Sequence, residues 1–220
     1  MTSMSDVEGL AEVRGVNEHI ARHSLDRLIM LSDGVFAIAI TLAALDVHLP
    51  NGRGALLPLL AVGSRSLLAY TLSFGIAGIF WVNHRNLFAR LRRVDAFLTV
   101  LTLTMLCLIA LVPATIRTLY ADGAGTANLR IYGLTMFACS ILNMLMWWYA
   151  SLRRGLMLPN IPREERQARA ALTASLPILF LPVLLMPMDS FAFAMLPIAV
   201  VVILGRRVLL ARAARHLDSA

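Results

Sequence analysis

The sequence predicts an all-α, polytopic membrane protein. Hydrophobic residues make up 59% of the 220 residues and charged residues only 15%, whereas soluble domains typically carry about a quarter of charged residues. The mean hydropathy is +0.74. Long apolar segments alternate with short arginine-rich gaps, which is the pattern of a chain that crosses a bilayer several times. We expect six transmembrane helices.

The six apolar segments are separated by recognisable boundaries. The first ends at the turn cluster 50–52, Pro-Asn-Gly. The second is interrupted by Arg65, and the fourth ends in the aromatic cluster 147–149, Trp-Trp-Tyr, which is typical of a membrane interface. Prolines are expected to kink the last two segments. The predicted spans are 27–49, 64–86, 96–120, 129–152, 171–186 and 190–204.

The arginines predict the orientation. All basic residues are arginine, and all except Arg53, Arg65, Arg117 and Arg130 lie at or before the start of the first span, from the end of span two to the start of span three, between spans four and five, or after the sixth. Positively charged loops face the cytoplasm. We therefore expect both termini to be cytoplasmic, with a cytosolic N-terminal tail (1–23), a transmembrane domain (24–211) and a cytosolic C-terminal tail (212–220).

The charge and the cysteines exclude several classes of partner. The net charge is +7, but because the arginines flank apolar segments, we expect them to contact lipid headgroups rather than nucleic acid. Cys107 and Cys139 lie inside apolar segments, which favours neither a disulfide nor a metal site. The N-terminal segment has no apolar core before a cleavage site and is not a signal peptide.

The first apolar segment contains the most specific residues. On a helix, Ile38, Leu42 and Leu45 recur at i, i+4 and i+7 and form one stripe, which Thr41 flanks and Asp46 continues. On spacing alone, ordinary helix packing is the simpler interpretation of this stripe, and Asp46 fits a carboxylate at a helix end equally well. Asp33 is different, since a carboxylate in a membrane requires a polar partner.

The segment from Arg27 to Thr41 resembles a known family. Arg27, followed after three residues by Leu-Ser-Asp-Gly (31–34) and then by the apolar run 35–42, is similar to the Arg-x-x-x-Phe-Ser-Asp signature of the transmembrane protein 175 potassium channels. Leu31 stands where the family usually has phenylalanine. The lysosomal members carry two copies of a six-span unit and this chain has the length of one, so the resemblance implies a homotetramer around a central pore.

The resemblance also implies roles for the stripe on the first helix. In that family the first helix lines the pore, and its bulky apolar residues form the constriction that passes potassium. Ile38, Thr41, Leu42 and Leu45 correspond to this constriction, with Ile38 at the narrowest layer. Four copies of Asp46 would attract cations at the outer mouth. No cofactor is expected apart from the permeating potassium ion.

A second set of residues resembles the family's structural network. The segment 81–84, Trp-Val-Asn-His, is similar to a Trp-x-x-His element whose side chains bond with the Ser-Asp pair. The resemblance implies that Arg27, Ser32, Asp33, Trp81 and His84 form a hydrogen-bond network that fixes the pore helix. Without the resemblance, His84 fits a solvated residue at the membrane interface better.

The predicted function is therefore a potassium-preferring cation channel of the bacterial inner membrane, and not an enzyme. Two alternatives stay open: a proton-coupled transporter that uses Asp33 and His84 as a relay, and a membrane enzyme or assembly factor without a conduction path. A Ser-His-Asp hydrolase is disfavoured, because the sequence has no nucleophile elbow and adjacent Ser32 and Asp33 point about 100° apart on a helix.

Overall fold

The computed structural model describes residues 4–46, 56–120 and 125–185, and all of its named elements are helical. These elements are α1 (Met4–Leu42), the short 3-10 helix η1 (Ala43–Asp46), α2 (Leu56–Phe88), α3 (Ala96–Tyr120), α4 (Thr126–Leu152) and α5 (Arg163–Leu185). The predicted sixth span and the C-terminal tail lie outside the described residues. The all-α prediction agrees with this part of the chain.

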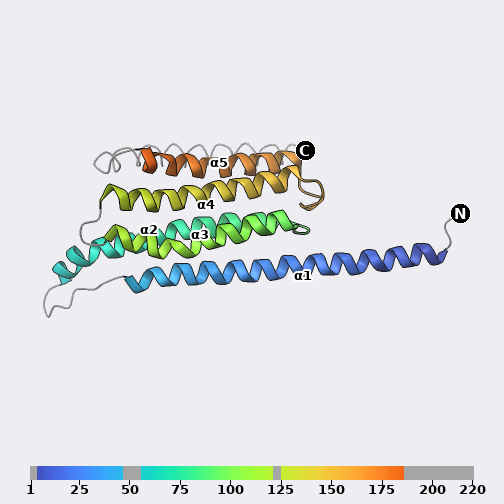
Figure 1. Ribbon diagram of the computed structural model, residues 1–220, viewed down its shortest axis with the longest axis horizontal. Coiled ribbons are helices and arrows are strands. Elements are labelled where there is room, and N and C mark those ends of the chain that lie inside the picture. Colours follow the sequence, from blue (N-terminus) through green and yellow to red (C-terminus); the bar gives the residue numbers. More distant parts are fainter. Residues whose placement is uncertain (1–3, 47–55, 121–124, 186–220) are drawn as a thin grey trace.

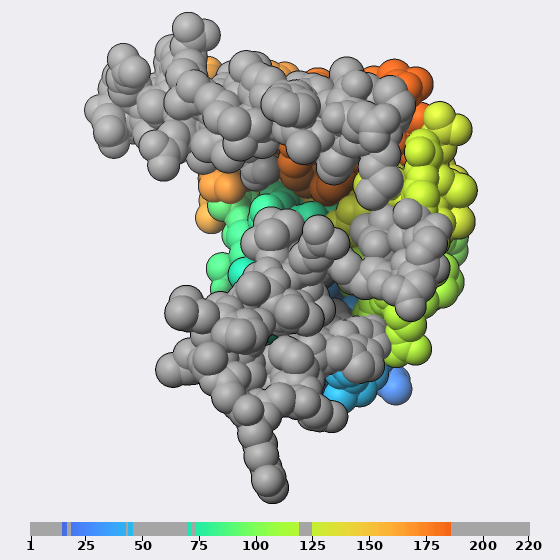
Figure 2. Space-filling model, turned by 90° about the vertical axis from the view of Figure 1, so that its left-hand side faces the viewer, coloured from blue at the N-terminus to red at the C-terminus, as the bar shows by residue number. Residues whose placement is uncertain are grey.

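The helices lie roughly antiparallel in an elongated bundle. Figure 1 shows α1 at one edge and α5 at the opposite edge, with α2, α3 and α4 between them. α1 packs on α3 and α2, α3 packs on α4, and α4 packs on α5. Figure 2, viewed from the end opposite the N-terminus, shows the same order from α1 to α5.

Three of the described helices, α3, α4 and α5, are long and apolar enough to cross a membrane. α3 has the bounds that the sequence predicts, and α4 begins three residues before its predicted span. α5 begins at Arg163, eight residues before the apolar segment, because a charged first turn with Glu164 and Glu165 suits the positive end of a helix. The chain is an all-α, multi-pass membrane protein.

α1 is much longer than a membrane crossing requires. Its 39 residues correspond to about 58 Å at the usual helical rise. The segment predicted as an N-terminal tail is, from Met4 onward, part of this same helix. Figure 1 shows that the N-terminal half of α1 extends past the ends of the other helices.

Two loops lie together at one end of the bundle, here called the loop end. They are residues 89–95, between α2 and α3, and residues 153–162, between α4 and α5. They pair through an antiparallel bridge between Leu91 and Met157, with backbone hydrogen bonds from Arg92 N to Leu156 O (2.7 Å) and from Leu158 N to Arg90 O (3.0 Å). Both helical hairpins are therefore fastened to each other at this end.

Candidate pore helix and its polar contacts

One face of α1 packs against the rest of the chain. The buried residues follow one another at spacings of three and four, which is one face of an α-helix: they are Leu25, Leu28, Ser32, Phe36 and Ala39. α2 and α3 provide the surface on which this face packs. Burying this face fixes which way the remaining side chains of α1 point.

The opposite edge of α1 is apolar and uncovered. The exposed fractions of Ile38 and Leu42 are 59% and 43%, and Leu45, in the following helix η1, is 75% exposed. Thr41 is also exposed, and its hydroxyl donates to the carbonyl oxygens of Ala37 (2.9 Å) and Ile38 (3.0 Å) within the helix. The described part of this chain does not cover this edge.

The α-helix ends earlier than the sequence predicts. It stops at Leu42, and residues 43–46 continue as the 3-10 helix η1. A 3-10 helix has three residues per turn instead of 3.6, so the predicted position of Asp46, one α-helical turn beyond Leu42, is wrong. The backbone of Asp46 closes η1. The last three residues of the predicted span, 47–49, lie outside the described residues.

Asp33 and Trp81 are joined directly. The indole Nε1–H of Trp81 on α2 donates to Asp33 Oδ1 at 2.8 Å. The guanidinium of Arg85, one turn further along α2, lies 4.9 Å from the centre of the Trp81 ring, which is within the range of a cation–π interaction. The Arg85 contact was not predicted, although the i, i+4 spacing of Trp81 and Arg85 was a signal for it.

The other predicted network residues are placed differently. Ser32 is fully buried, but its hydroxyl donates to Leu28 O on its own helix at 2.7 Å. His84 is 3% exposed and its ring packs against Phe88 and Phe36, at centroid distances of 4.1 and 5.8 Å. Among the described residues, neither His84 nitrogen has a hydrogen-bond partner.

Arg27 is exposed, and no hydrogen bond or ion pair joins it to the other four residues in the described part of the chain. The structure thus brings together Asp33 and Trp81 with a hydrogen bond, and places Ser32 and His84 in the adjacent core. It does not bring Arg27 into that group.

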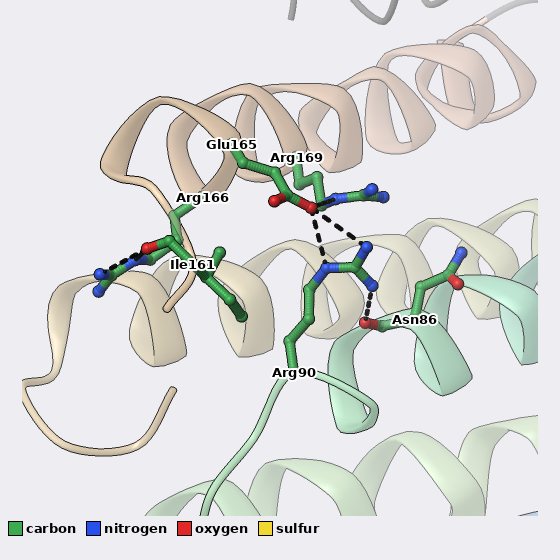
Figure 3. Close-up of polar contacts among 6 residues, drawn as sticks. All are labelled: Asn86, Arg90, Ile161, Glu165, Arg166 and Arg169. Carbon is green, nitrogen blue, oxygen red and sulfur yellow. Dashed lines mark hydrogen bonds and ion pairs between the residues drawn. The ribbon is translucent and has the colours of Figure 1, made fainter. Parts of the chain in front are cut away.

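A second polar cluster lies at the loop end and was missed by the sequence analysis. Figure 3 shows Arg90 reaching from the end of α2 to Glu165 on α5. Arg90 Nε and a terminal nitrogen both lie 3.2 Å from Glu165 Oε1, and Arg169 Nε donates to the same oxygen at 2.8 Å. Arg90 also donates to Asn86 O at 2.7 Å. Nothing in the sequence pairs two residues so far apart in the chain.

The described residues contain no group of three or more His, Cys, Asp or Glu side chains that could hold a metal ion. The features that remain are a helical bundle with three long apolar helices, and a further helix, α1, that has an uncovered apolar edge and a carboxylate bonded to an indole. These features define the class: a multi-pass helical protein whose polar side chains support helix packing.

The comparisons with known proteins agree with this class. Residues 27–113 match the family model described as endosomal/lysosomal potassium channel TMEM175. A potassium channel of Streptomyces collinus is 37% identical over 148 residues, which cover 64% of this chain and 72% of that protein. A potassium channel of Chamaesiphon minutus is 29% identical over 150 residues, covering 64% and 73%.

A solved structure shows the same fold. The crystal structure of the TMEM175 homologue from Chamaesiphon minutus superposes with a TM-score of 0.64 at 24% identity, covering 87% of this chain and 98% of that one. This chain belongs to the TMEM175 family of potassium channels. The family consists of ion channels, so the chain is a TMEM175-type channel and not an enzyme.

Proposed function

We propose that four copies of the chain assemble into a potassium-preferring cation channel whose pore is lined by α1. The observation that carries this proposal is the uncovered edge of Ile38, Leu42 and Leu45. Its opposite face is packed into the bundle, so the edge is free to meet its copies at an axis. Symmetric rings are a common assembly of identical chains.

The constriction would consist of Ile38, Thr41, Leu42 and Leu45. The Thr41 hydroxyl already donates to carbonyl oxygens of its own helix, so the neck is largely apolar and provides few oxygens to replace an ion's water shell. Selection then depends on the cost of dehydration, which is lower for potassium than for the more tightly hydrated sodium. An apolar neck of this kind also closes by losing its water. The expected selectivity is weaker than that of a carbonyl-lined filter.

Asp46 would act beyond the constriction. Its backbone lies at the end of η1, four residues after Leu42. A ring of four carboxylates at the mouth of a pore raises the local concentration of cations. Its role is to attract the ion before the ion loses water at the constriction.

The proposed network would hold α1 in place without touching the ion. Trp81 binds Asp33, and His84 and Ser32 occupy the core beside them. In this proposal Arg27 is the fifth member of the network, and it would make its contacts only once the copies of the chain have assembled. This arrangement supports α1 against α2 while the opposite edge faces the pore.

The proposed topology has six spans in the transmembrane domain 24–211, with cytoplasmic tails 1–23 and 212–220. The distribution of arginines supports cytoplasmic termini in the bacterial inner membrane. The same arginines would contact anionic lipid headgroups. Partners are then three further copies of the chain, membrane lipids and monovalent cations.

The proposal is tested with the purified full-length protein in planar bilayers under a potassium gradient. Unitary currents are expected, because a single open channel passes ions fast enough to be resolved, whereas the turnover of a single carrier is too slow. Ile38→Asn should change both the conductance and the potassium-to-sodium permeability ratio, since it puts an amide into the apolar neck.

Ile178→Asn on α5 is the matched control. Ile178 has the same exposed fraction as Ile38, 59%, but lies far from the proposed pore helix in the bundle order. Its currents should match those of the unmodified protein. If Ile38→Asn behaved like Ile178→Asn, the constriction would not lie at Ile38. A flux without unitary currents would favour the proton-coupled transporter.

A further inference from the structure

A stripe of unpartnered polar groups lies inside the bundle on α4. Asn143 and Trp147 are 1% and 2% exposed. The Asn143 amide nitrogen, the Trp147 indole nitrogen and the Ser151 hydroxyl are buried and have no hydrogen-bond partner within the described structure. Their spacing of four and four residues puts them one above another on one face of the helix.

The stripe occupies only the loop-end half of α4. The buried residues of the other half are apolar or small: Leu129, Gly133, Met136 and Cys139. Ser151 lies in the last turn, and Asn143 lies about 12 Å deeper at the usual helical rise. The polar stripe therefore begins at the loop end and stops near the middle of the bundle.

Leaving three buried groups unbonded is costly. An unsatisfied buried donor loses its bonds to water without replacement, which destabilises the folded state, and native structures seldom leave such groups unpaired. Buried water usually makes about three hydrogen bonds to groups of this kind. An amide and an indole on successive turns, with Cβ atoms about 5–6 Å apart, are close enough to be joined by a single water molecule.

We propose that the loop-end half of each subunit contains a buried hydration site, in which water bonds to Asn143, Trp147 and Ser151. The Asn143 amide nitrogen and the Trp147 indole nitrogen can only donate hydrogen bonds, so they require an acceptor. A water oxygen can accept both bonds. The Ser151 hydroxyl both donates and accepts, so it connects this water toward the loop end. The site lies on α4, away from the exposed edge of α1, and does not depend on the proposed pore.

The first test is hydroxyl-radical footprinting by radiolysis of water, on the full-length protein in lipid nanodiscs. Radicals formed from bound water oxidise the side chains beside it even when these are closed to bulk solvent. Trp147 should be oxidised, whereas Met136, which is equally buried in the apolar half of α4, should not. Asn143→Leu removes one bond to the water and should reduce the oxidation of Trp147.

Two results would overturn the hydration site. One is a Trp147 that stays as unreactive as Met136 in the unmodified protein. The other is equal oxidation of both residues, which would show general opening of the bundle and not a local site.

The second test is the direction of a melting-temperature shift. If water satisfies the amide, Asn143→Leu should lower the Tm by about 2–4 °C, the shift expected for roughly 1 kcal/mol in a chain of this size. If the site is dry, the same change removes an unpaired group and should raise the Tm, which contradicts the proposal. Ser140→Ala is the control, because the Ser140 hydroxyl is already bonded to Met136 O. Should Asn143→Leu not fold, footprinting of the unmodified protein decides alone.

Discussion

Asp33 shows how a charge is accommodated on the helix that contains the predicted first span. Its carboxylate accepts a hydrogen bond from Trp81, and the Arg85 guanidinium lies over the ring of the same tryptophan. Bonding to an indole N–H offsets part of the cost of taking the carboxylate from water. The bond also fixes the position of α1 along α2, because it joins Asp33 to Trp81.

Asp33→Ala should impair assembly, because Trp81 loses its acceptor and α1 loses its polar link to α2. We expect the peak of the proposed tetramer to diminish in size-exclusion chromatography with light scattering. Asp33→Asn is the matched control, since the amide oxygen still accepts from Trp81, and it should retain most of the proposed tetramer. Unchanged tetramer in Asp33→Ala would remove the supporting role assigned to this residue.

Residue-level contacts were predictable only where a motif supplied them. The partnership of Asp33 with Trp81 was expected from the resemblance and has a hydrogen bond in the structure. The Ser32 hydroxyl could not be assigned from sequence, since a serine on a helix bonds equally well to its own backbone, as it does here. Arg90 and Glu165 have no sequence signal because a loop geometry brings them together.

At the scale of elements, periodicity and composition located the apolar helices better than their ends. α3 was predicted with its observed bounds because charged and polar residues flank it on both sides. α5 and α1 continue as helices into polar sequence, where hydropathy carries no information about helix formation. The change to a 3-10 helix after Leu42 had no signal in the sequence.

The packing of α4 on α5 depends on the absence of a side chain at Gly133. A Cβ atom there would overlap the Val183 side chain and lie 3.6 Å from Leu184. Gly133→Ala should therefore destabilise the protein by about 1–3 kcal/mol, as overpacking of a core does. A lower Tm in detergent is the expected result.

Gly75→Ala is the comparison for this prediction. A Cβ at Gly75 would meet no described residue within 4 Å. The same change on α2 should therefore leave the Tm equal to that of the unmodified protein or slightly higher, because alanine is the better helix former. Equal Tm values for both variants would show that α5 shifts without cost to accommodate the methyl group.

At the scale of the whole molecule, the loop end joins the two helical hairpins. The backbone bridge at Leu91 and Met157 and the contacts of Glu165 with Arg90 and Arg169 connect α2 to α5 across the bundle. Tyr149 on α4 adds a hydrogen bond to Asp95, the residue before α3, at 2.5 Å. These contacts hold in place elements that are distant in the sequence.

Glu165→Ala should weaken this junction, because one carboxylate serves two arginines. The pair is partly exposed, with 21% of each of the Glu165 and Arg90 side chains accessible, so we expect a loss of only about 1 kcal/mol. The melting temperature measures it. The neighbouring Glu164, which is exposed, provides the control variant Glu164→Ala, and a similar Tm for the two would mean that the ion pairs contribute nothing.

The length of α1 has a mechanical consequence. Residues 4–42 form one uninterrupted helix, and its N-terminal half stands clear of the bundle (Figure 1). A helix without a hinge behaves as a stiff rod, so a force or twist applied near its first turns reaches Ile38 about 50 Å away. A molecule that bound the N-terminal end of α1 could therefore move the residues around Ile38 at the other end of the same helix.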